Sequence, residues 1–191
     1  MTPQLADKQE AVLDATLELI GERGFHGTPM SAIARKAGVG AGTIYRYWES
    51  KEALINALYV REKSRINARL LAGYHTGLSA REAFALIFRN GIEARQEDPS
   101  CTRFLDQYYN SPFIGDENRR TRERLMGEYL QIIERGVAAG ELRDLPRPLI
   151  LAMLFGPAMQ LASSLPAGDE GLGGETMELL LDAVWRAIGT G

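Results

Sequence analysis

Cysteine and histidine are almost missing from this chain of 191 residues. It contains one cysteine, Cys101, and two histidines, His26 and His75. A lone cysteine forms no intramolecular disulfide and supplies no cysteine-rich zinc site, and the histidines are not at metal-ligand spacing. We therefore expect no metal and no cofactor. A buried thiol at Cys101 is a better explanation than a redox-sensitive one, although the sequence leaves both open.

Long apolar runs are missing as well. The most apolar stretch, Leu149 to Ala162, is interrupted by Gly156-Pro157 and Gln160, and it is shorter than the roughly 20 residues that span a bilayer. The N-terminus, Met1 to Gln4, has no basic segment followed by an apolar core, so we expect no signal peptide. Together with the scarcity of cysteine, this pattern predicts a cytoplasmic protein.

The chain also lacks a strong excess of one charge and the motifs of common enzymes. Its formal net charge is −3, so a surface for nucleic acid must gather its basic residues locally. No HExxH, nucleophile elbow or Walker loop occurs. The glycine-rich segment from Gly168 to Gly174 lacks the Lys-Ser/Thr of a phosphate-binding loop, which favours a hinge or surface loop. An enzyme is therefore the weaker alternative.

What the sequence has is helical periodicity from end to end, with no alternating strand pattern. The expected helices cover about Asp7–Arg23, Thr28–Ala37, Ala41–Trp48, Ser50–Leu71, Ser79–Gln96, Asp98–Ser111, Asp116–Ala139, Asp144–Leu165 and Glu175–Ile188. We predict an all-α fold of about nine helices. An N-terminal three-helix domain with a helix-turn-helix would occupy residues 1–50, and a C-terminal helical bundle residues 51–191.

The helix-turn-helix prediction rests on residues 28 to 48, where two short helices flank Gly38-Val39-Gly40. In this arrangement the second helix can enter the major groove of DNA. No acid occurs from Gly24 through Trp48, so this region is locally basic. Its three basic residues are Arg35, Lys36 and Arg46. The charge pattern alone leaves a second interpretation open, a three-helix core with a solvated basic face.

The detailed pattern resembles the DNA-binding signature of the TetR family of regulators. The matching residues are Gly24-Phe25, Thr28, Met30, Ile33-Ala34, Ala37-Gly38-Val39, Gly42-Thr43-Ile44-Tyr45, Tyr47-Trp48, Ser50-Lys51-Glu52 and Leu54. They cover about a quarter of the chain. The order and length of the later helices also look like that family, without a comparable motif.

The resemblance implies which residues contact DNA. Thr43 and Arg46 would face the groove, Arg46 reading guanine or holding a phosphate. Tyr45, Tyr47 and Lys51 would mainly hold phosphates. The full predicted set is Thr28, Gly42, Thr43, Tyr45, Arg46, Tyr47 and Lys51. In this set Thr28 would cap the second helix and the small Gly42 would permit close approach. The implied core residues are Ile33, Ala34, Ala37, Val39 and Ile44.

Proteins of this family bind an effector in the C-terminal domain and dimerise through the last two long helices. The helix from Leu149 to Leu165 is apolar on more than one face, so it must be buried all round. The last helix offers an apolar stripe from Met177 to Ile188. These faces complete either a monomer core or a two-fold interface. We favour the homodimer, because a two-fold DNA site needs a two-fold protein.

The effector pocket is the least determined feature. Its candidate lining residues are Phe84, Phe88, Phe104, Tyr108, Arg122, Met126 and Met153, with Met159 and Gln107 as further candidates. Methionines and aromatics also fill ordinary cores, which stays an alternative for each. We predict a DNA-binding repressor, released from a palindromic operator by a small, mainly apolar effector. The helix from Ser50 to Leu71 would be the lever. A helical ligand-binding or interaction module without DNA binding is the alternative.

Overall fold

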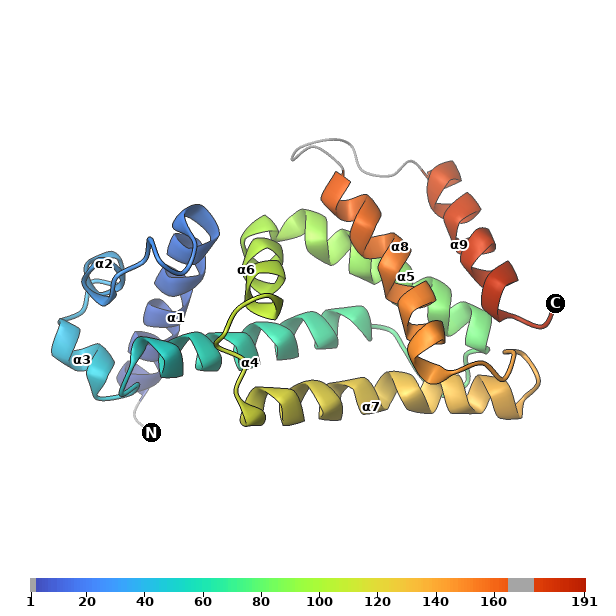
Figure 1. The fold of residues 1–191 in the computed structure, drawn as a ribbon, viewed down its shortest axis with the longest axis horizontal. Coiled ribbons are helices and arrows are strands. Elements are labelled where there is room, and N and C mark those ends of the chain that lie inside the picture. The colour runs from blue at the N-terminus through green and yellow to red at the C-terminus, as the bar shows by residue number, and fades with distance from the viewer. Residues whose placement is uncertain (1–2, 165–173) are drawn as a thin grey trace. The chain divides into compact units, whose positions relative to one another are not determined.

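The computed structural model describes residues 3–164 and 174–191, and its regular structure there is helical (Figure 1). The helices are α1 Pro3–Arg23, α2 Met30–Lys36, α3 Ala41–Tyr45, α4 Lys51–Leu70, α5 Ala80–Glu97, α6 Pro99–Tyr109, α7 Asp116–Ala138, α8 Arg147–Ser164 and α9 Gly174–Ile188. The described ranges contain nine helices and no strand, which confirms the all-α prediction. No helix in these ranges is long and apolar enough to cross a membrane.

Helix ends lie close to where capping residues predict them. Gly24 and Gly140 take the left-handed conformation, with φ of +69° and +74°, after α1 and α7. The Ser79 side chain accepts a hydrogen bond from Glu82 N, and the Glu82 side chain accepts one from Ser79 N, so α5 starts with a capping box. At the start of α4, Ala53 N donates to the Ser50 hydroxyl oxygen at 3.0 Å. Residues 168–173 of the predicted glycine-rich segment lie outside the described residues.

The predicted second helix of the helix-turn-helix is too long. It was expected to reach Trp48, but α3 ends at Tyr45. Beyond it, the amides of Tyr47 and Trp48 both donate to the Ile44 carbonyl, at 2.9 and 3.0 Å, so the regular helical ladder ends in a bifurcated turn. This tight turn leads the chain into α4.

The described chain divides into two compact units. The first unit contains the residues up to Ser64 together with Pro99–Arg122, and the second contains Arg65–Asp98 together with the residues from Glu123 onward. The division falls within α4 and within α7. The expected functional boundary after residue 50 stays a prediction.

The first unit is built on α1, which packs against α6 and α2, while α2 packs against α3. Ile33, Ala34 and Ile44 are buried as predicted, whereas Ala37 and Val39 are only half-buried. The Phe25 ring meets the edge of the Phe104 ring, with centroids 6.1 Å apart. These contacts join the helix-turn-helix to one apolar core.

The second unit packs α5 against α8 and α9, and α8 against α9. Its core contains Phe84, Phe88, Ile133, Ile150 and Trp185.

A short backbone clip fixes the end of the chain within the second unit. Arg143 N donates to Ile188 O at 2.9 Å, and Thr190 N donates to Glu141 O at 3.0 Å. Leu142 and Gly189 form an isolated antiparallel bridge between these bonds. The C-terminal end of α9 is therefore tied to the loop that follows α7.

Candidate functional site

The helix-turn-helix is held together from inside and leaves its polar residues outside. Ile33 on α2 and Ile44 on α3 have no exposed surface. Gly38 joins the two helices with a φ of +66°, which an L side chain rarely adopts. This packing turns Arg35, Tyr45 and Arg46 toward solvent.

Tyr45 and Arg46 lie at the exposed end of α3. Tyr45 is 53 % exposed. Within the described residues, the guanidinium groups of Arg35 and Arg46 have no protein partner. Two free guanidiniums and an exposed phenol are groups that donate to phosphate oxygens and base edges.

Two other predicted groups of this surface are partly engaged within the protein. The Lys51 ammonium donates to the Phe25 carbonyl, and burial lowers the pKa of Lys51. Lys36 pairs with Glu18 on α1.

The other predicted contact residues differ in exposure. Tyr47 is half-buried and its ring meets Trp48 edge-on, with centroids 5.7 Å apart. Thr43 is half-buried and Gly42 exposed, and a Cβ atom added at Gly42 would meet nothing within 4 Å.

The predicted role of Thr28 as the cap of the second helix is wrong. The residue before α2 is Pro29, which has extended backbone angles, and no side chain caps this helix. The Thr28 hydroxyl donates instead to the Gly24 carbonyl at 2.9 Å, at the end of α1. Thr28 has no exposed surface, so its side chain belongs to the packing of the unit.

Replacing Thr28 by valine is expected to lower the free energy of unfolding by about 1 kcal/mol, because the half-buried Gly24 carbonyl loses this donor. Urea unfolding followed by circular dichroism measures this. The matched control is Thr43→Val, whose hydroxyl is on the more exposed face of α3. Equal stability of the two variants would contradict the assigned role of Thr28.

The candidate effector residues fall into different units. Phe104 and Tyr108 are fully buried in the first unit, where the Tyr108 ring stacks on Tyr59 with centroids 4.2 Å apart. The Tyr108 hydroxyl donates to Asn56 Oδ1 at 2.9 Å. Arg122, also in this unit, is exposed, and Gln107 is half-buried. Packing and hydrogen bonds account for both aromatic rings without a ligand.

The remaining candidates lie in the second unit, and two of them line a cavity. Phe84 and Phe88 border a space of about 450 Å³ between α5, α8 and α9, which we call the α5–α9 cavity. Met126 packs half-buried against the core, and Met153 and Met159 are exposed.

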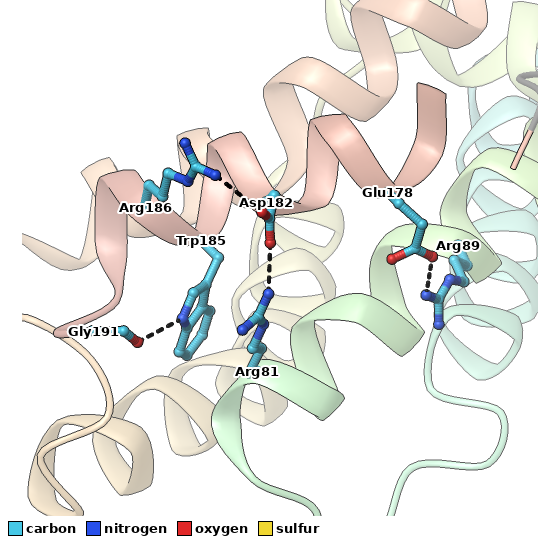
Figure 2. Close-up of polar contacts among 7 residues, drawn as sticks. All are labelled: Arg81, Arg89, Glu178, Asp182, Trp185, Arg186 and Gly191. Atoms are coloured by element: carbon cyan, nitrogen blue, oxygen red, sulfur yellow. Dashed lines mark hydrogen bonds and ion pairs between the residues drawn. The ribbon is translucent and has the colours of Figure 1, made fainter. Parts of the chain in front are cut away.

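Sequence reasoning missed most of the residues around this cavity. The apolar ones are Leu78, Leu154, Leu181, Val184 and Trp185, and the charged ones are Arg81, Glu82, Arg89, Glu178 and Asp182. Figure 2 shows two ion pairs that join α5 to α9. Arg81 Nη2 lies 2.6 Å from Asp182 Oδ1, and Arg89 Nη2 lies 2.5 Å from Glu178 Oε1. The spacing of these charges along each helix was the available signal, but it does not say which helices meet.

A third feature is the exposed apolar surface of α8 and α9. Large hydrophobic side chains there are open to solvent: Leu149, Met153 and Met159 on α8, and Leu179 on α9. Leu179 is 67 % exposed, the highest value among them. Leu149 and Met153 are one turn apart and share a helix face. Such a surface is typical of a helix that packs against another molecule.

These features define a class of protein, and comparison with known families identifies it. Residues 12–58 match the family model for bacterial regulatory proteins of the tetR family. Residues 59–190 match the model for the tetracyclin repressor-like C-terminal domain. The chain belongs to the TetR family of transcriptional regulators, which confirms the resemblance found in residues 24–54.

Known relatives cover nearly the whole chain. The fatty acid metabolism regulator protein of Bacillus subtilis is 25% identical over 191 residues, covering 95% of this chain and 97% of its own. A TetR family transcription regulator from Marinobacter aquaeolei has the same fold, with a TM-score of 0.89 at 24% identity, over 99% of both chains. The regulator FadR of Bacillus subtilis, solved in complex with stearoyl-CoA, has a TM-score of 0.72 at 24% identity and covers 93% of this chain and 95% of its own.

Proposed function

We propose that this protein is a homodimeric, cytoplasmic repressor that binds a palindromic DNA operator and is released from it by a small, mainly apolar effector. The observation that carries this proposal is the exposed pair Arg46 and Tyr45 at the end of α3, within an intact helix-turn-helix. Family membership and the regulators among its relatives support it, and they favour it over an enzyme.

The DNA-contacting set follows from exposure. Arg35 and Arg46 carry the free guanidiniums, Tyr45 adds an exposed hydroxyl, and Gly42 and Thr43 lie on the same short helix. Arg46 reads a base edge or holds a phosphate. Tyr47 and Lys51 hold phosphates, Lys51 by releasing the Phe25 carbonyl when DNA offers a stronger acceptor.

The dimer forms through α8 and α9. Leu149, Met153, Met159 and Leu179 lose their exposed apolar surface when two copies pack these helices together. The two copies present two recognition helices, which a palindrome requires to lie roughly 34 Å apart or a multiple of it.

The effector binds in the C-terminal domain. The stearoyl-CoA complex of FadR supports a mainly apolar ligand, since acyl chains bind in aromatic and aliphatic pockets. An effector that binds the DNA-free form more tightly lowers operator affinity, because coupling between two sites is reciprocal. Helix α4, the proposed lever, continues from the helix-turn-helix into the second unit.

The first experiment is selection from a random duplex library with the purified full chain, without added effector. Recovery of an inverted repeat with half-sites about one turn apart supports a dimeric, sequence-specific regulator. Recovery of nothing above background at low salt contradicts the proposal and favours a helical module without DNA binding.

Replacing Arg46 by alanine is then expected to weaken operator binding by about 1–3 kcal/mol, roughly 5- to 150-fold. If Arg46 reads a base, the loss depends on the operator sequence. If it holds a phosphate, the loss is the same for every operator sequence, and the slope of log affinity against log salt concentration becomes shallower by about one. Fluorescence anisotropy at several salt concentrations measures both. Arg119→Ala is the matched control, because Arg119 lies on α7 and pairs with Asp116. Equal losses in the two variants would contradict a specific role for Arg46.

A further inference from the structure

The α5–α9 cavity is a partly open space whose lining combines apolar and charged side chains. Its volume of about 450 Å³ falls within the range of small-molecule sites. The edges of four mostly buried side chains, Phe84, Phe88, Leu154 and Trp185, supply apolar surface to the lining. Arg81 and Arg89 of α5 and Asp182 and Glu178 of α9 supply charged groups, and they pair across the two helices (Figure 2).

Both ion pairs of the cavity lining are exposed, and exposed ion pairs contribute little to stability. The side chains of Arg81 and Asp182 are 59% and 44% exposed. Those of Arg89 and Glu178 are 45% and 64% exposed. Each arginine is therefore open to exchange its protein carboxylate for one from solution.

Arg81 is better placed for this exchange than Arg89. Its guanidinium lies 5.9 Å from the centre of the Trp185 ring, a cation–π position that does not depend on Asp182. Trp185 is itself held by Phe84, edge-on at 6.4 Å, and by the bond from its Nε1 to the Gly191 carbonyl at 3.3 Å. Arg81 thus keeps a fixed support when its anionic partner changes.

Asp182 also tolerates the loss of Arg81. Its second oxygen lies 3.3 Å from Arg186 on the same helix, so one arginine remains beside it. An incoming cation has no such advantage. It would have to displace Arg81 or Arg89 from a carboxylate and leave that guanidinium beside its own positive charge. Glu82 also lines the cavity, but its carboxylate accepts hydrogen bonds from Ser79 at the start of α5. Arg81 is therefore the point at which an anionic ligand is favoured.

We propose that the α5–α9 cavity binds an amphipathic organic acid, with its apolar body on Phe84, Phe88 and Trp185 and its carboxylate on Arg81 in place of Asp182. This proposal rests on the proposed function in one respect, that the acid is then the effector. The acid then lies between α5 and α9, and α9 carries the proposed dimer surface.

Tryptophan fluorescence tests the site directly and without DNA. The chain has two tryptophans, so Trp48→Phe leaves Trp185 as the single reporter. The probes are octanoate, decanoate and cyclohexylacetate, none of which absorbs at the excitation wavelength, each compared with its uncharged amide. We expect saturable changes in Trp185 emission and at least tenfold tighter binding of the acid than of the amide.

Three substitutions, each made in the Trp48→Phe variant, test the role of Arg81 through the affinity for the acids. Arg81→Gln weakens acid binding at least tenfold, because the carboxylate loses its partner. Asp182→Asn tightens it severalfold, because the competing carboxylate is gone. Arg147→Gln is the matched control, since Arg147 of α8 pairs with Asp144 and does not line the cavity. It leaves acid binding unchanged.

The proposal is overturned if no acid gives a saturable change, if acid and amide bind equally, or if Asp182→Asn weakens binding. Thermal unfolding of each variant confirms that it is folded. Operator selection uses no effector, so its outcome does not depend on whether the acids bind. If the protein binds the acids but no DNA, the ligand site stands and the proposed function is wrong. If it binds DNA but none of the acids, the proposed function stands and the ligand site is wrong.

Discussion

Glutamate at both Met153 and Leu179 is expected to convert the proposed dimer into a monomer and to reduce operator affinity roughly 100-fold or more, since each monomer then binds one half-site alone. Both side chains are exposed in the single chain, so the substitutions do not disturb its own core. In the dimer they would place four carboxylates in an apolar interface, where unpaired charges are costly. Sedimentation velocity measures the mass and anisotropy the affinity.

The control for this variant is a pair of exposed residues on α7, outside the proposed interface. Gln131→Glu and Ala138→Glu together add the same charge without touching Met153 or Leu179. We expect this pair to stay dimeric. If Met153→Glu with Leu179→Glu also stays dimeric, then α8 and α9 do not form the interface.

Replacing Phe104 by alanine is expected to lower the free energy of unfolding by about 3–5 kcal/mol, which is a large share of the total for an ordinary domain. Phe104 has no exposed surface, and its ring packs against Phe25 and Tyr108. Because the ring is fully buried, its neighbours fill the space left behind only in part. Chemical unfolding at several urea concentrations measures the change.

This experiment separates the two interpretations of Phe104 that the sequence left open. If Phe104 is a core residue, its replacement lowers stability and leaves the effector affinity of the folded protein unchanged. If Phe104 lines an effector pocket, its replacement changes effector affinity and lowers stability only slightly. Phe104→Leu is the control, because it retains most of the apolar volume and is expected to cost less than half as much.

Local signals explain why much of this fold was predictable. Ser79 and Glu82 form a capping box at the start of α5, and Gly24 and Gly140 follow the ends of α1 and α7; such features depend on residues a few positions apart and can be read from the sequence. The helix-turn-helix is equally local. Its length of about 20 residues contains both helices and the turn, so its pattern is complete in the sequence.

Partners distant in sequence were not predictable in the same way. One local partner was missed too, because the Thr28 hydroxyl donates to the Gly24 carbonyl four residues earlier and not to the second helix as expected. Lys51 reaches the carbonyl of Phe25, 26 positions earlier. The pairing of Arg81 with Asp182 spans 101 positions. Periodicity identifies which residues share a helix face, but it does not say which faces meet.

The backbone clip at the C-terminus determines how α9 is able to move. Residues 188–190 are bonded to residues 140–143, so this end of the helix acts as a pivot. Separation of α9 from α5 is then a rotation, and displacement grows with distance from the pivot. Glu178 and Leu179, roughly three turns from Ile188, swing through a wider arc than Trp185. A small opening beside Arg81 is thus amplified at the far end of the helix, where Leu179 would meet the second copy.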